Sequence, residues 1–104
     1  GMINAEKLAL MKPSALLINV ARGPVVVSRD LADALNRGVI AGAGIDVFDK
    51  EPPLDQTEPL LSAKNCLVTP HVAFATQESM SLRAEIVFRN LDAWLRGAPE
   101  NIVL

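Results

Sequence analysis

Three short runs of apolar, mostly branched residues stand out along the chain, at residues 15–20, 40–47 and 66–69. The first run does not alternate polar with apolar positions. This pattern is typical of a strand in a parallel sheet whose two faces are both covered by helices. We therefore predict three strands of a small parallel sheet.

A helix is predicted between the first two runs. Leu31, Ala34 and Leu35 recur at i, i+3 and i+4 and form an apolar stripe. Ser28 is a suitable N-cap before this stripe, and Gly38 stands where a helix ends in a left-handed residue. Strand, helix and strand then make a βαβ unit, which is right-handed in nearly all proteins.

Further helices are predicted towards both ends of the chain. Asn4 can cap a helix over residues 5–11, which Pro13 ends. A longer helix is predicted from about residue 77 to residue 96, before a Gly-Ala-Pro segment. Residues 48–59, rich in proline and acidic residues, are expected to form a structured loop. The apolar face of the longer helix contains Met80, Ala84, Val87, Leu91 and Trp94.

The fold class is therefore α/β, but three strands are few for a nucleotide-binding fold. No Gly-x-Gly-x-x-Gly motif occurs in the chain. The nearest sequence, around Gly42 and Gly44, lies inside a predicted strand rather than in a strand-to-helix turn. These two glycines are expected to allow close packing of a helix on the strand.

Composition excludes several classes of protein. The 104 residues suffice for one domain, and half of them are hydrophobic, with a mean hydropathy of +0.27. A net charge of −2 without a basic cluster argues against nucleic acid, and no apolar run approaches the ~20 residues of a membrane span. One cysteine, Cys66, and one histidine, His71, are too few for a disulfide or a structural zinc site. We expect no metal and a reducing, cytoplasmic location.

Polar residues gather where the predicted strands end. Arg22 follows the first strand, Asp46 and then Glu51 follow the second, and His71 follows the third. Because ligands of open parallel sheets bind outside the carboxyl ends of the strands, these residues are candidates for a site. Arginine can hold a carboxylate bidentately, histidine can exchange a proton near neutral pH, and a carboxylate can orient the imidazole. Each residue alone is equally compatible with a solvated loop.

Three motifs occur in order along the chain. They are Asn19-Val-Ala-Arg-Gly23, Gly42-Ala-Gly-Ile-Asp-Val-Phe-x-x-Glu-Pro52 and Thr69-Pro-His71. Together they closely resemble the C-terminal half of the nucleotide-binding domain of D-isomer-specific 2-hydroxyacid dehydrogenases, over nearly the whole chain. The resemblance implies a partial Rossmann-like, doubly wound parallel sheet of about three strands with flanking helices, without the glycine-rich first half.

The resemblance also implies roles for the candidate residues. His71 would be the catalytic acid/base, Glu51 its partner, and Arg22 the residue that binds and polarises a 2-keto acid. The cofactor would be NAD or NADP. Asp46 would contact its nicotinamide carboxamide, and the backbone of Ala21, Arg22, His71 and Ala73 would line the nicotinamide end of the site.

Two positions bear on the substrate. Formate dehydrogenases of the wider superfamily have glutamine as the partner of the histidine, so Glu51 favours a hydroxy acid. Residues 71–76, with Phe74, look more like glycerate/hydroxypyruvate reductases, and a phosphoglycerate dehydrogenase-like member is the alternative. Val27 and Ser28 depart from the family, which usually has an acidic or amide residue there.

The resemblance further implies a fragment. Residues 1–98 would be the C-terminal half of an NAD(P)-binding domain, and residues 99–104 a tail that leads back to a substrate domain. Such enzymes are about three times longer, and their phosphate loop and ribose selector precede the segment present here. The chain by itself is expected to be inactive and to bind the cofactor weakly. The alternative is a non-catalytic interaction module or a decayed gene remnant.

Self-association is also expected. In the family, the strand at residues 15–20 pairs with a strand that is missing here, so its edge would expose unpaired N–H and C=O groups. The long helix adds apolar surface on more than one stripe. We predict a homodimer or higher homo-oligomer that buries the helix, the strand edge, or both.

Overall fold

The computed structural model describes residues 1–51 and 54–103. Pro52 and Pro53, from the expected loop and the second motif, and Leu104, from the expected tail, lie outside the described residues. The chain forms two compact units, Gly1–Ala73 and Phe74–Leu104, which are treated separately below.

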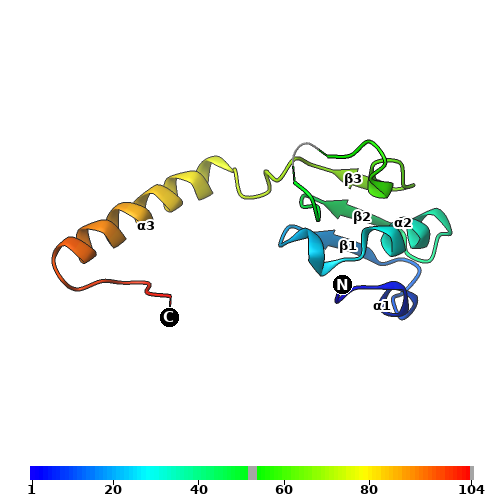
Figure 1. The fold of residues 1–104 in the computed structure, drawn as a ribbon, viewed down its shortest axis with the longest axis horizontal. Helices are drawn as coiled ribbons and strands as arrows, with labels where there is room; N and C mark the ends of the chain where they lie inside the picture. The colour runs from blue at the N-terminus through cyan, green and yellow to red at the C-terminus, as the bar shows by residue number, and fades with distance from the viewer. Residues whose placement is uncertain (52–53, 104) are drawn as a thin grey trace. The chain divides into compact units, whose positions relative to one another are not determined.

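The first unit contains a parallel sheet of three strands, as the sequence predicts. Strands β1 (Leu16–Asn19), β2 (Gly42–Ile45) and β3 (Cys66–Val68) lie side by side in the order β1-β2-β3 (Figure 1). Leu17 pairs with Ala43, and Ala43 pairs with Cys66. The strands are shorter than the apolar runs, because the outer residues of each run already belong to the connecting loops.

Two helices flank the sheet in this unit, α1 (Ala5–Ala9) and α2 (Ser28–Asn36). The Asn4 side chain accepts a hydrogen bond from the Lys7 N–H at 3.2 Å, which confirms the predicted cap of α1. The prediction of Ser28 as the cap of α2 was wrong by one residue. Val27 holds the cap position because its extended backbone precedes the helix and its carbonyl accepts from Leu31. The short turns η1 (Gly23–Val25) and η2 (Pro59–Leu61) complete the unit.

The hydrophobic core lies between one face of the sheet and α2. Leu31, at the centre of the predicted stripe of α2, is fully buried, as are Ala34 and Leu35. The same cluster contains Leu17, Ala43 and Ile45 from the strands, Leu8 from α1 and Leu60 from η2. The apolar stripe read from the sequence is therefore the face that α2 turns towards the sheet.

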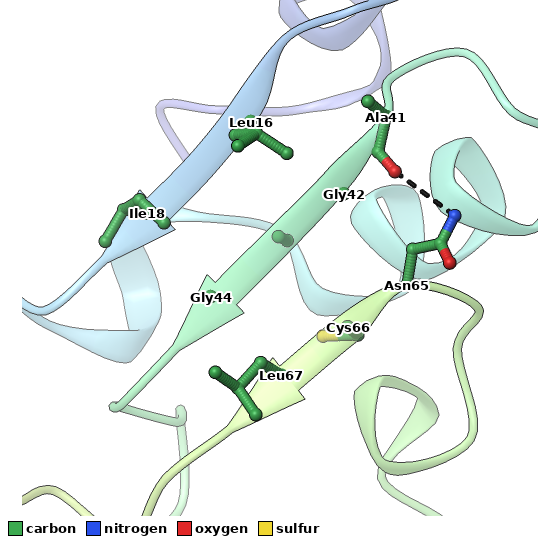
Figure 2. Close-up of a pocket in the computed structure, with 9 residues that line it drawn as sticks. Leu16, Ile18, Ala41, Gly42, Gly44, Asn65, Cys66 and Leu67 are labelled. Carbon is green, nitrogen blue, oxygen red and sulfur yellow. Dashed lines mark hydrogen bonds between the residues drawn. The ribbon is translucent and has the colours of Figure 1, made fainter.

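Within the first unit, the opposite face of the sheet is open. Leu16, Ile18 and Leu67 are about two-thirds exposed and border a groove of about 500 Å³ that runs over β2 (Figure 2). Gly42 and Gly44 form its floor. A Cβ on Gly44 would lie 3.0 Å from the Cδ1 of Ile18, so this glycine accommodates a neighbouring strand rather than the expected helix.

The second unit is dominated by α3 (Gln77–Leu95), which agrees with the predicted helix. Thr76 caps it by accepting from the Ser79 N–H at 3.1 Å, and Gly97 follows it with a φ of 73°. Only Ala93 of α3 is buried. Among the helices of the described residues, none combines the length and the apolar character needed to cross a membrane. The predicted apolar face is largely exposed, at Met80, Val87, Leu91 and Trp94.

Candidate active site

The three strand ends carry the candidate residues and are joined to one another by backbone hydrogen bonds. The Asp46 N–H, just after β2, donates to the carbonyl of Asn19 at the end of β1 at 3.0 Å. The His71 N–H, just after β3, donates to the carbonyl of Asp46 at 2.9 Å. The segments that follow the three strands therefore start from one edge of the sheet, as the parallel topology predicts.

His71 and Glu51 form the central contact of this edge. The Nδ1 of His71 lies 2.7 Å from the Oε2 of Glu51, and both side chains are about two-fifths exposed. Because an ionised carboxylate only accepts hydrogen bonds, Nδ1 carries a proton in this contact. The Nε2 of His71 is then the ring atom that can exchange a proton with a ligand.

The backbone of His71 has an unusual conformation. Its φ of 55° lies in the left-handed region. This conformation costs a non-glycine residue about 1–2 kcal/mol. Asn65 and Asn101 also have positive φ among the described residues, and asparagine and histidine adopt this conformation more often than most non-glycine residues do. Such backbone conformations persist where the surrounding structure holds them, and they cluster at functional sites.

Asp46 holds the segment that contains His71. Its carboxylate is 3% exposed. Its Oδ1 accepts from the Thr69 hydroxyl at 2.5 Å and from the Val72 N–H at 2.9 Å, and its Oδ2 accepts from the Ala73 N–H at 2.9 Å. Burial of the carboxyl opposes its ionisation, but these hydrogen bonds and the nearby His71 lower the pKa of Asp46 below its usual value.

Arg22 belongs to a separate turn after β1. Its Nη1 donates to the carbonyl of Ala21 at 2.7 Å, and both residues are exposed. The buried side chain of Asn19 fixes this turn: its Nδ2 donates to the Arg22 carbonyl at 3.0 Å, and its Oδ1 accepts from the Ala21 N–H at 3.2 Å. The guanidinium of Arg22 is thus engaged with its own turn in this structure.

Gly23 brings the turn after β1 against the loop after β2. A Cβ at this position would lie 2.0 Å from the carbonyl carbon of Phe48 and 2.4 Å from the nitrogen of Asp49. Only glycine permits this approach of two backbones. The glycine of the first motif therefore sets the spacing between the turn of Arg22 and the loop that leads to Glu51.

The edge contains a small cavity of about 50 Å³. Its volume suits one or two water molecules rather than a dinucleotide, so a larger ligand would lie on the open surface beside it. Among the described residues, no three His, Cys, Asp or Glu side chains gather as metal ligands would. The cavity is lined by Asp46, Phe48, Glu51, Leu54, Pro70 and His71.

Three residues that support the site were not identified as such from the sequence. Asn19 ends an otherwise apolar run, and a polar residue at such a position is a signal that could have identified it. Thr69 and Gly23 were noted only as members of motifs. Their contacts, with Asp46 and with the backbone of Phe48, join segments that are distant in sequence and become visible only in the folded chain.

The fold and the edge define an α/β protein of partial Rossmann type with a histidine–glutamate pair at the strand ends. The profile of the D-isomer specific 2-hydroxyacid dehydrogenase NAD binding domain matches residues 1–73. The chain belongs to this family. The resemblance read from its three motifs is thereby confirmed, as is the fold class.

Individual relatives agree with this assignment. The chain is 45% identical over 103 residues to a hydroxypyruvate reductase of Blautia hydrogenotrophica, covering 99% of this chain and 32% of that protein. It is 52% identical over 96 residues to a glyoxylate reductase of Pyrococcus furiosus, covering 92% and 28%. The chain thus spans about a third of the length of these curated relatives.

Solved structures of the family are also similar. The D-isomer specific 2-hydroxyacid dehydrogenase of Lactobacillus delbrueckii, in its NAD-complexed form, has a TM-score of 0.80 at 34% identity, covering 99% of this chain and 35% of that one. An NADPH-dependent glyoxylate/hydroxypyruvate reductase of Sinorhizobium meliloti, in complex with citrate, has a TM-score of 0.74 at 42% identity, covering 89% and 29%.

A glycine-to-alanine pair tests the close approach at Gly23. Gly23→Ala should lower the free energy of unfolding by about 3 kcal/mol, because the new methyl group meets backbone atoms that cannot move aside. Gly38→Ala is the control: its φ is also positive, at 71°, but no atom lies within 4 Å of the added Cβ. It should cost only about 1 kcal/mol. Urea unfolding measures both, and equal losses would contradict the clash.

Acid should release the loop that Asp46 holds. Because the folded-state pKa of Asp46 lies below its usual value of 3.8, its ionised form stabilises the fold above that pH. This contribution is lost as the pH falls below 3.8. Asp46→Asn should therefore flatten the fall in unfolding free energy between about pH 4 and pH 2. Hydrogen bonds from Thr57 also lower the pKa of Asp55, so Asp55→Asn is the control. It should flatten the curve but leave amide exchange at Val72 and Ala73 unchanged.

Proposed function

We propose that this chain is the part of an NAD(P)-dependent D-2-hydroxyacid dehydrogenase that carries the catalytic acid/base. The observation that carries the proposal is the 2.7 Å contact between His71 Nδ1 and Glu51 Oε2 at the carboxyl edge of the sheet. The family, to which residues 1–73 match as an NAD binding domain, supports it. The reaction is the reduction of a 2-keto acid to a D-2-hydroxy acid, or its reverse.

His71 supplies the proton in the direction of reduction. Its Nε2 donates a proton to the oxygen that develops negative charge at C2 of the substrate, and takes that proton back during oxidation. Glu51 accepts from Nδ1–H, so it fixes the ring orientation and stabilises the imidazolium form. A glutamate suits a reaction in which the histidine changes its charge.

Arg22 is the residue proposed to bind the substrate. A guanidinium can hold the substrate carboxylate with two parallel hydrogen bonds and stabilise the developing charge on the C2 oxygen. In the present structure Nη1 donates to the carbonyl of Ala21, so Arg22 would exchange this contact for the substrate. Its exposed position leaves the side chain free to turn.

The residues of the edge fit the nicotinamide end of a cofactor. When bound, NAD(P)H supplies the hydride that is added at C2. The Oδ2 of Asp46 accepts one hydrogen bond among the described residues, so it retains a lone pair for a carboxamide N–H. The exposed Ala21, Arg22 and Ala73 would line this end, with His71. Because these 104 residues contain no glycine-rich phosphate loop, we expect the chain alone to bind the cofactor weakly and to be inactive.

Glyoxylate and hydroxypyruvate are the proposed substrates. Relatives with 45–52% identity are named as reductases of these compounds. The remaining two-thirds of those proteins has no counterpart in this chain, so residues outside it would share in selecting the substrate.

A chimera tests the proposed reaction. Residues 1–104 would replace the matching third of the Blautia reductase, and oxidation of NADH would be followed with glyoxylate or hydroxypyruvate. His71→Ala should lower kcat about a thousandfold, because the proton donor is lost, and should leave the Kd for NADH within about threefold. Glu51→Gln should lower kcat less. Lys64→Ala, at an exposed residue before β3, is the control and should leave kcat unchanged.

Two outcomes would count against the proposal. An active chimera whose kcat is unaffected by His71→Ala would remove His71 from the mechanism. A chimera that assembles and binds NADH but is inactive with 2-keto acids would favour a non-catalytic role for this chain. The 104-residue chain itself, assayed in parallel, should not oxidise NADH.

We also infer that the chain self-associates. Leu16, Ile18 and Leu67 are 66–70% exposed on the open face of the sheet, and β1 is an edge strand. In the second unit, Phe88 and Trp94 of α3 are 71% and 65% exposed. Apolar surfaces of this kind are usually covered in soluble proteins, and a second copy of the chain offers the same surfaces in return.

Light scattering tests this inference. The mass at micromolar concentration should be at least twice 11.1 kDa. Ile18→Glu and Trp94→Glu change the two apolar surfaces separately, so the variant that lowers the mass identifies the interface. Glu85→Lys, an exposed charge change on α3, is the control. A wild-type mass of 11.1 kDa would contradict self-association.

A cytoplasmic location is part of the same proposal. Cys66 is a free cysteine, and burial raises the pKa of its thiol, which keeps it in the unreactive protonated form. A free thiol of this kind suits a reducing compartment.

A further inference from the structure

Two polar side chains are buried among the described residues, and they occupy equivalent places. Asn19 is 5% exposed at the end of β1, and Asp46 is 3% exposed immediately after β2. Within the part of the chain that the structure describes, no buried side-chain nitrogen or oxygen lacks a hydrogen-bond partner. The buried polar atoms of both side chains therefore have partners, and the identity of these partners indicates what the two residues do.

Within the described part of the chain, the side chain of Asn19 bonds only to the turn that carries Arg22. Its amide nitrogen donates to the Arg22 carbonyl at 3.0 Å, and its amide oxygen accepts from the Ala21 N–H at 3.2 Å. The Arg22 carbonyl also accepts from the N–H of Val25, the last residue of η1, at 3.2 Å. The Asn19 side chain thus closes the turn around the backbone of Arg22 without touching its guanidinium.

Among the described residues, the side chain of Asp46 bonds only to the segment that carries His71. Its three donors, the Thr69 hydroxyl and the Val72 and Ala73 N–H groups, lie on both sides of His71 in the sequence. The left-handed backbone of His71, with a φ of 55°, brings these donors to one carboxylate. In the same backbone conformation, the Nδ1 of His71 lies 2.7 Å from the Oε2 of Glu51.

We propose that Asn19 and Asp46 are paired positioning residues, of which Asn19 presets the turn that carries Arg22 and Asp46 presets the segment that carries His71. The proposal rests on the proposed function for the roles of Arg22 and His71. Each buried side chain fixes one loop at the end of one strand, and the backbone bond from Asp46 N–H to the Asn19 carbonyl joins the two anchors. Catalytic groups that are held before a ligand binds lose little freedom on binding.

Isosteric exchanges test each anchor separately in the 104-residue chain, without cofactor or substrate. Asp46→Asn keeps the shape of the side chain but replaces one acceptor oxygen by an NH₂ donor. A single acceptor oxygen then remains for the three donors that the carboxylate serves. The exchange rate of the Ala73 amide should rise at least about tenfold. The chain has one histidine, so its ring signals are unambiguous. The fraction of neutral His71 protonated on Nδ1 should fall at least about twofold in ¹⁵N spectra.

Asn19→Asp is the reciprocal variant. It keeps the acceptor for Ala21 but removes the donor to the Arg22 carbonyl. Amide exchange at Val25 should rise at least about tenfold, and the guanidinium of Arg22 should rotate faster, while the His71 tautomer stays as in the wild type. Asp46→Asn should in turn leave the signals of Arg22 unchanged. If either substitution only destabilised the fold as a whole, the Arg22 signals and the His71 tautomer would change together in each variant.

Two variants of Thr69 cover the case in which Asp46→Asn fails to fold. Thr69→Val removes one donor to Asp46 and should shift the His71 tautomer, whereas Thr69→Ser keeps the hydroxyl and should restore it. Folded Asp46 and Thr69 variants with an unchanged tautomer would overturn the role of Asp46. Unchanged Arg22 signals in folded Asn19→Asp would overturn that of Asn19. Neither readout involves hydride transfer, so a failure here is distinct from an inactive chimera.

Discussion

The hydrogen bonds between the buried carboxylate of Asp46 and the segment after β3 are the interactions on which the candidate site depends. One side chain receives the Thr69 hydroxyl and the N–H groups of Val72 and Ala73. These bonds hold the left-handed backbone of His71. The imidazole contacts Glu51 in that conformation, so a buried residue shapes the geometry of a partly exposed one.

A second constraint comes from backbone packing at Gly23. The approach of this residue to Phe48 and Asp49 keeps the turn of Arg22 next to the loop after β2. The side-chain hydrogen bonds of Asn19, at the end of β1, fix this turn. The candidate site is thus built from loops, but each loop is held by a contact that originates in a strand or in the backbone beside it.

The two faces of the sheet differ within the first unit: one is buried in the core and the other is exposed. Its core lies on the side of α2, whereas Leu16, Ile18 and Leu67 face outward on the other side (Figure 2). The apolar strands match a sheet covered on both faces. The chain spans about a third of the length of the curated relatives it matches.

The sequence by itself determined the local secondary structure and the candidate residues of the site. Apolar runs predicted three parallel strands, the stripe of Leu31, Ala34 and Leu35 predicted α2, and strand ends predicted where Arg22 and His71 would lie. These features follow from periodicity and from residues adjacent in the chain. The cap of α2 was missed by one residue, because backbone geometry at Val27 decided it.

Only the tertiary structure decided which groups meet. Asp46 and Ala73 are 27 residues apart in sequence, and His71 and Glu51 are 20 apart, yet each pair is within hydrogen-bond distance. The sequence could name Asp46 as a site residue but could not show that its carboxylate is occupied by the loop of His71. Long-range contacts depend on how the strand ends are brought together, and no local pattern encodes the resulting distances.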